Sequence, residues 1–185
     1  MTDAQAIHRL KDGDIDGLDF LIKRYQLKAL RAAFLITHDE QIAEEVVQET
    51  FVRFFQRASR FDANRPFEPY LLRSVVNAAL NATRERSRWV QVGSESDLES
   101  LEGLLSHAIT VEAQVEFNQV KHDVLQALAK LPPRQRAVIV QRYYLQMSEK
   151  EMAEDLNAAA GTIKWLLSAA RERLRRLLGN ERSEE

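Results

Sequence analysis

The stretch at residues 44–55, EEVVQETFVRFF, constrains the fold of this 185-residue chain more than any other. At about 100° per residue, one arc of a helix through it is apolar. That arc carries Ala43, Val46, Val47, Thr50, Phe51 and Phe54. The opposite arc is rich in acids and amides: Glu45, Gln48, Glu49 and Gln56, with Val52 in its middle. The pattern predicts a helix buried on its first arc, whose second arc is either a solvated face or a surface for a partner.

Turn and strand signals are rare in the rest of the chain. Only six glycines and four prolines interrupt it, and alternating β-branched runs are scarce, which favours an all-α protein. Asp39 and Ser148 suit helix N-caps, and Asn157 suits the left-handed conformation at a helix end. Apolar spacing predicts helices near residues 4–11, 16–36, 39–58, 67–88, 111–130, 134–144, 148–156 and 160–178, followed by a polar tail from Gly179.

Several classes of protein are disfavoured by what the sequence lacks. The chain has no cysteine, no apolar run near the ~20 residues of a membrane span, and no signal peptide at its N-terminus. Its four histidines are scattered, and no phosphate-binding glycine motif or catalytic constellation is present. We therefore expect a cytoplasmic protein without membrane insertion, which is not an enzyme and has no catalytic residue, metal site or cofactor.

Charge is distributed unevenly along the chain, although the formal net charge is only −2. Residues 65–88 contain five Arg and two Glu, a net charge of +3, and residues 161–178 carry one Lys, four Arg and one Glu, a net charge of +4. Between them, residues 93–118 carry five Glu, one Asp and no cation, a net charge of −6. We expect two small helical domains, residues 1–92 and 119–185, joined by an acidic linker at residues 93–118.

The helix expected at residues 67–88 has a basic, aromatic stripe opposite its apolar arc. Cations on such a stripe meet phosphates, and an aromatic ring offers a surface on which a base can stack. The alternative is an ordinary solvated face with one half-buried tyrosine. The stripe consists of Tyr70, Arg73, Asn77, Asn81, Arg84 and Arg88.

A short helix, a tight turn and a longer basic helix follow one another between residues 148 and 178. This order predicts a helix-turn-helix, with a plain helical hairpin as the alternative. Ile163, Leu167, Ala170, Leu174 and Leu177 form the apolar arc of the longer helix. Its exposed positions are Lys164, Trp165, Ser168 and Arg171. Upstream, Val120, Val124, Leu125 and Leu128 share helical spacing.

Three stretches together resemble the sigma-70 family of bacterial transcription initiation factors, in its extracytoplasmic-function (group IV) branch. They read EEVVQETFVRFF, RFDANRPFEPYLLRSVVNAALN and LAKLPPRQRAVIVQRYYLQMSEKEMAEDLNAAAGTIKWLLSAARERL. The resemblance covers nearly the whole chain, in the same two-domain order. It implies a region 2 domain at residues 1–92, a region 4 domain at residues 119–185, and no chemistry in the protein itself.

The resemblance implies an alternative sigma factor that binds core RNA polymerase and directs initiation at specific promoters. The β′ clamp helices would contact Glu45, Gln48, Glu49 and Val52. The minus-ten element would meet Arg65, Tyr70, Arg73, Asn77, Asn81, Arg84 and Arg88. The minus-thirty-five element would meet Thr162, Lys164, Trp165, Ser168 and Arg171. Further expected contacts are the β flap with the C-terminal domain, the RNA exit path with the acidic linker, and an anti-sigma factor as a separate partner.

The second helix of the helix-turn-helix departs from the family pattern. The family often reads G-T-V-K-S-R-L-x-R-A-R there, and this chain reads GTIKWLLSAAR from Gly161 onward. Trp165 and Leu166 then lie near the expected DNA-facing side, where they contact either thymine methyl groups or a protein partner. The loss of two arginines also leaves a second hypothesis open, a sigma-like decoy or interaction protein that binds polymerase or an anti-sigma factor without reading promoters.

Overall fold

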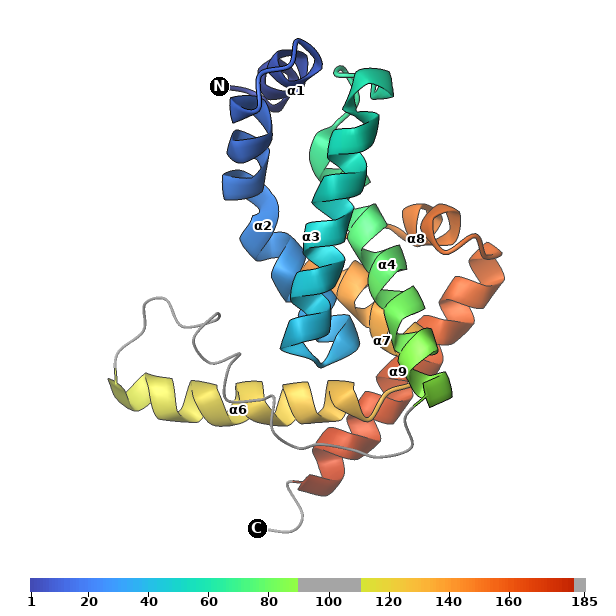
Figure 1. Ribbon diagram of the computed structural model, residues 1–185. Coiled ribbons are helices and arrows are strands. Elements are labelled where there is room, and N and C mark those ends of the chain that lie inside the picture. Colours follow the sequence, from blue (N-terminus) through green and yellow to red (C-terminus); the bar gives the residue numbers. More distant parts are fainter. Residues whose placement is uncertain (90–110, 182–185) are drawn as a thin grey trace. The chain divides into compact units, whose positions relative to one another are not determined.

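The computed structural model describes the backbone of residues 1–89 and 111–181 and the side chains of residues 1–86 and 120–179. Every regular element in these residues is helical, which confirms the all-α prediction (Figure 1). The chain divides into two compact units, Met1–Trp89 and Val90–Glu185. The elements are α1 (Asp3–Lys11), α2 (Asp16–Thr37), α3 (Glu40–Arg57), the 3₁₀ turn η1 (Ala58–Arg60), α4 (Phe67–Trp89), α6 (Val111–Ala129), α7 (Pro133–Ile139), the π-helical turn η2 (Val140–Tyr144), α8 (Glu149–Asp155) and α9 (Ala160–Glu181).

The N-terminal unit is a bundle in which α2, α3 and α4 pack against one another and α1 packs on α2 (Figure 1). The approach of α1 is very close, because a Cβ atom at Gly17 would lie only 2.2 Å from the Ala6 carbonyl oxygen. Glycine is therefore required there for packing space. The Tyr25 hydroxyl donates to the Asp3 carboxylate at 2.6 Å, and burial together with this carboxylate raises the pKa of Tyr25 well above its usual range.

Helix α3 buries the apolar arc expected of it: all six predicted side chains of that arc are buried. The one hydroxyl among them, on Thr50, donates to the Val46 carbonyl oxygen at 2.7 Å, so burial leaves no hydroxyl without a partner. Asp39 caps the helix as predicted, accepting from the Ile42 N–H at 2.9 Å. The other carboxylate oxygen of Asp39 pairs with Arg86 of α4, which ties the first turn of α3 to the second half of α4.

In the C-terminal unit the predicted helix boundaries are set by local chemistry. Pro133 begins α7, Ser148 and Glu151 form a capping box at the start of α8, and Asn157 has a φ of 46°. Helix α8 packs on α9, which confirms the helix-turn-helix. Gln141 and Asp155, both buried, hydrogen-bond to each other and join η2 to α8. Of the predicted linker, residues 93–110 lie outside the described residues, and its last part falls in α6.

Three details differ from the prediction. The helix expected at residues 134–144 ends in the π-helical turn η2, closed by a bond from the Leu145 N–H to the Val140 carbonyl oxygen. Helix α9 continues through Gly179 to Glu181, where a polar tail was expected. On α6, Leu125 and Leu128 are buried while Val120 and Val124 are exposed, so only part of the predicted apolar set of this helix is packed in the core.

The orientation of α3 can be tested by substituting two phenylalanines that lie one turn apart on this helix. Phe51 is 5% exposed, whereas Phe55 is 46% exposed. Phe51→Ala should lower the free energy of unfolding by about 3–5 kcal/mol, because it leaves a cavity in the core. Phe55→Ala should cost about 1 kcal/mol or less. Urea unfolding followed by circular dichroism measures both, and equal losses would contradict this orientation of α3.

Candidate functional site

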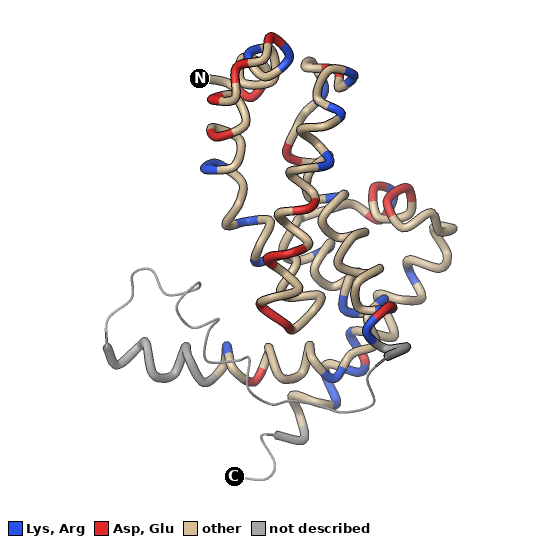
Figure 2. Tube along the Cα trace, viewed as in Figure 1, with Lys and Arg blue, Asp and Glu red and all other residues tan. Residues whose placement is uncertain are grey.

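The polar arc of α3 forms a continuous exposed stripe. Acidic residues follow one another along this helix (Figure 2). Glu49 is held by Arg53 one turn later, at 2.6 Å, and Glu45 accepts from the Gln41 amide at 3.2 Å. Burial of the opposite arc of α3 puts these carboxylates on the outer face of the helix. The structure thus brings the four residues predicted for polymerase binding together on one face: Glu45, Gln48, Glu49 and Val52.

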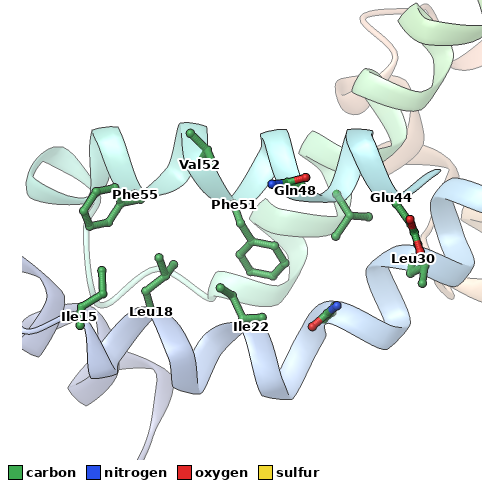
Figure 3. A pocket seen from close by; sticks show the side chains of 11 residues that line it. Ile15, Leu18, Ile22, Leu30, Glu44, Gln48, Phe51, Val52 and Phe55 are labelled. Atoms are coloured by element: carbon green, nitrogen blue, oxygen red, sulfur yellow. The ribbon is translucent and has the colours of Figure 1, made fainter. Parts of the chain in front are cut away.

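An apolar groove of about 480 Å³ runs between α2 and α3 alongside this stripe (Figure 3). Ile15, Leu18 and Ile22 line it from α2 and the residue before that helix, and Phe51, Val52 and Phe55 line it from α3. Gln48 and Val52 belong to both the stripe and the groove. Since Ile15, Val52 and Phe55 are all exposed, the surface offers apolar area beside negative charge. The sequence signal for the groove was the presence of Ile15 and Phe55 outside the predicted apolar arcs.

Along the predicted stripe on α4, solvent exposure increases toward the C-terminal end of the helix. Tyr70, Arg73 and Asn77 are half-buried, and Asn81 and Arg84 are exposed. Tyr70 is fixed by aromatic packing, with its ring centroid 4.9 Å from that of Phe61. A ring held in this way presents its remaining face without further ordering. The Arg88 side chain lies outside the described residues.

The loop before α4 carries Arg65 in an ordered turn. The Asp62 carboxylate accepts from the Asn64 N–H at 3.0 Å, and the Arg65 N–H donates to the Asp62 carbonyl oxygen at 3.0 Å. Arg65 is exposed and borders a recess of about 400 Å³, which is also lined by Asp3 and Arg24. The basic and polar groups expected near the minus-ten element therefore begin in this loop and continue along α4.

The second helix of the helix-turn-helix, α9, presents the predicted residues to solvent. Ile163, Leu167 and Ala170 are buried against the rest of the unit. Lys and Arg residues recur along the same helix (Figure 2). The exposed predicted residues are Thr162, Lys164, Trp165, Ser168 and Arg171.

The expectation that Leu166 lies near the DNA-facing side was wrong. Leu166 is 6% exposed, whereas its neighbour Trp165 is 64% exposed. The reason is angular: Leu166 is three residues after Ile163 and four before Ala170, so it shares their buried arc. Trp165 is therefore a single large apolar side chain on a polar face, without Leu166 as a neighbour on that surface.

Tyr143 is a surface residue that the sequence analysis missed. It lies on η2 and is 54% exposed. Its hydroxyl accepts from the Arg171 Nε–H at 2.8 Å, and the guanidinium carbon of Arg171 lies 5.8 Å from the centre of its ring. The partners are 28 residues apart in sequence, and the π-helical turn that exposes Tyr143 has no clear sequence signal, so spacing alone did not link them.

A buried cation in the C-terminal unit has a structural role. Arg136 donates to the carbonyl oxygens of Ala129 and Leu131, at 2.8 and 3.0 Å, and so satisfies the end of α6. Burial lowers the pKa of Arg136 to about 10, which still leaves it charged at neutral pH. Arg86 likewise serves the fold through its pairing with Asp39.

Among the residues that the structure describes, no group of three or more His, Asp or Glu side chains could hold a metal ion. Across the same residues, no helix is both long and apolar enough to cross a membrane.

Two families match this chain. The family described as Sigma-70 region 2 matches residues 21–88, and the family described as Sigma-70, region 4 matches residues 121–174. The ECF RNA polymerase sigma factor SigW of Bacillus subtilis is 27% identical over 176 residues, 93% of this chain and 94% of that protein. The RNA polymerase sigma-H factor of Pseudomonas aeruginosa is 27% identical over 182 residues, 95% of this chain and 93% of that protein.

Solved structures show the same fold. CnrH, solved in complex with the cytosolic domain of CnrY, aligns with a TM-score of 0.62 at 24% identity, over 96% of this chain and 97% of that one. The sigma factor RpoE from Bartonella quintana, solved with the anti-sigma factor NepR, aligns with a TM-score of 0.59 at 22% identity, over 87% of this chain and 97% of that one. Because the two family matches cover well over half of the chain, in the family's own order, it belongs to the sigma-70 family, in the extracytoplasmic-function branch.

Proposed function

We propose that this chain is an alternative sigma factor, which binds core RNA polymerase and directs transcription initiation at specific promoters. The observation that carries the proposal is the presence of both family regions in one chain, in which the predicted contact residues that the structure describes are exposed or half-buried. The protein supplies recognition and DNA opening, and the polymerase supplies the chemistry, so we propose no enzymatic activity for the sigma factor itself. Its place of action is then the cytoplasm.

For polymerase binding, we propose that the stripe on α3 contacts the β′ clamp helices. Glu45, Gln48 and Glu49 supply charge and hydrogen bonding, and Val52 joins them to the apolar groove beside α2. Apolar area beside charge suits an interface in which burial supplies affinity and charge fixes orientation. We also propose that the C-terminal unit contacts the β flap of the polymerase, and that the acidic linker at residues 93–118 runs toward the RNA exit path.

For the minus-ten element, we propose that the loop around Arg65 and the α4 stripe hold the non-template strand. Tyr70, fixed against Phe61, offers a ring on which an unpaired base stacks. The strand would then follow Arg73, Asn77 and Asn81 toward Arg84 and Arg88. The proposed boundaries for this domain are residues 1–92.

For the minus-thirty-five element, we propose that α9 enters the major groove. Thr162 and Ser168 are short hydroxyl side chains that can reach base edges or phosphates, and Lys164 and Arg171 supply cations for phosphates. Trp165 supplies an apolar contact for thymine methyl groups. The proposed boundaries for this domain are residues 119–185.

We also propose an anti-sigma factor as a partner. CnrH and RpoE, which share this fold, were each solved with another protein bound, CnrY and the anti-sigma factor NepR. In this chain, the exposed apolar groove between α2 and α3 offers a surface for such a protein. A protein seated there would also cover Gln48 and Val52 and so compete with polymerase.

Run-off transcription with core polymerase tests the proposed function against the decoy. We expect transcripts from a subset of genomic promoter fragments, formed only when this protein is added. Core polymerase alone is the control. Polymerase binding without any dependent transcript across the fragments would contradict the proposal and favour the decoy.

The polymerase contact is tested by reversing an acidic charge on α3 and, as a control, a matched acidic charge on α2. Gln48→Ala with Glu49→Lys should weaken binding to core polymerase by roughly tenfold or more, because like charges across an interface are costly. Helicity should stay unchanged. The control is Asp19→Lys on α2, since Asp19 and Glu49 have side chains 57% and 58% exposed and each pairs with a cation one turn later. An equal effect of both changes would show that net charge, not the α3 stripe, matters.

Trp165 is tested by selecting binding sites from randomised minus-thirty-five elements. If Trp165 packs on thymine methyl groups, Trp165→Ala should relax preference at one or two base pairs, by about tenfold or more for a contact worth about 1–3 kcal/mol. Lys164→Ala is the comparison, and it should weaken binding to all sequences alike. Identical selected sequences for the wild type and Trp165→Ala would refute the DNA contact and point to a protein partner for this side chain.

A further inference from the structure

The starting point is the exposed contact between Tyr143 and Arg171 in the C-terminal unit. Tyr143 lies before the helix-turn-helix, on η2, and Arg171 lies on α9. The contact has two parts: the hydrogen bond from the Arg171 Nε–H to the Tyr143 hydroxyl at 2.8 Å, and the guanidinium placed 5.8 Å from the ring centre. Exposed contacts of this kind add little to stability. The main consequence of this contact is therefore the set of hydrogen-bond donors that it presents to solvent.

The π-helical turn is what places Tyr143 on the surface. In η2 the wider turn closes with the bond from the Leu145 N–H to the Val140 carbonyl oxygen, at 3.0 Å. Val140 and Gln141 are buried, and Gln141 bonds to Asp155. The side that faces inward is thus fixed by packing and by a buried polar contact, so Tyr143, two residues after Gln141, is held facing outward.

The hydrogen-bonding capacity of the pair suits an anion. The bond through Nε uses one of the five N–H donors of the guanidinium, and the other four are on the two terminal nitrogens, one of them on the same edge of the planar group as the Nε–H. The tyrosine oxygen accepts from Arg171, so its own O–H proton remains able to donate. The contact therefore places guanidinium N–H donors next to a hydroxyl donor, which suits the several oxygens of a phosphate group.

We propose that Tyr143 and Arg171 form one binding site for a DNA backbone phosphate beside the major groove that α9 enters. Arg171 supplies the charge. Tyr143 is a positioning residue for the guanidinium and donates its hydroxyl proton to the same phosphate. The proposal rests on the proposed function, and it adds Tyr143 to the DNA-contacting residues predicted for the C-terminal unit.

The site is tested by duplex binding of the full chain, measured as a function of salt concentration. The probe is a 30-base-pair DNA duplex of arbitrary sequence, because phosphate contacts do not depend on base sequence. Arg171→Ala should reduce the slope of log affinity against log salt by about 1. Tyr143→Phe, which keeps the ring and the net charge, should lower affinity by about three- to tenfold.

Coupling between the two changes distinguishes this site from two independent contacts. In the Tyr143→Phe background, Arg171→Ala should cost clearly less affinity than it does in the wild type, because the guanidinium has already lost its orientation. Arg173→Ala is the matched control: it removes the same charge from the same helix, two residues away and on a different face, and should cost the same in both backgrounds. Tyr143→Phe should leave the unfolding temperature within roughly 2 °C of the wild type, because the residue is exposed.

The outcomes separate this inference from the proposed function. An equal cost of Arg171→Ala in both backgrounds would overturn the shared site, even if run-off transcription shows that the chain directs initiation. Failure of the wild-type chain to bind the duplex at the lowest salt would also overturn it. Failure of run-off transcription together with clear coupling would instead retain the phosphate site and reject promoter-directed initiation.

Discussion

Burial of the apolar arc of α3 between α2 and α4 is the constraint on which the N-terminal unit depends. Phe51 and Phe54 enter the core from this helix, and Phe54 lies 4.6 Å, between ring centres, from Phe67 at the start of α4. Once these rings are buried, the helix has no rotational freedom. Its opposite arc, with Glu45 and Glu49, must then face outward. The polar stripe is therefore a geometric consequence of core packing, and any partner of α3 meets it in one orientation.

In the C-terminal unit, buried polar groups help to fix how the helices are oriented. Arg136 satisfies two carbonyl oxygens at the end of α6, and Gln141 of η2 bonds to Asp155 of α8. Such buried contacts are costly if broken and so favour one arrangement of the short helices. This arrangement sets α9 with Ile163 and Leu167 inward, which leaves Lys164 and Trp165 outward. The basic helix is thus oriented by buried residues.

Local patterns predicted most of this structure because the decisive interactions are short in sequence. Caps at Asp39 and Ser148, the proline at the start of α7 and the spacing of core residues on α3 act within one or two turns. Two of the misses involve packing between distant segments: the exposure of Val120 depends on where α6 meets the rest of its unit, and the contact of Tyr143 with Arg171 depends on a turn with an extra residue. The burial of Leu166 was a local miss, because its spacing from Ile163 and Ala170 already places it on the predicted apolar arc.

The same difference between local patterns and packing of distant segments applies to the candidate surfaces. The stripes on α3, α4 and α9 lie along single helices, so helical periodicity was enough to group their residues. The groove between α2 and α3 requires two helices, and its depth depends on how closely they approach. No single-helix pattern contains that information, although Ile15 and Phe55 were apolar residues left outside the predicted arcs.

The groove between α2 and α3 also bears on the colloidal behaviour of the unbound protein. Ile15, Val52 and Phe55 leave apolar surface in contact with water, and a formal net charge of −2 gives little electrostatic repulsion between molecules. Repulsion falls further near the sequence isoelectric point of about 6.1. The surface proposed for partner binding thus favours self-association of the unbound chain near that pH.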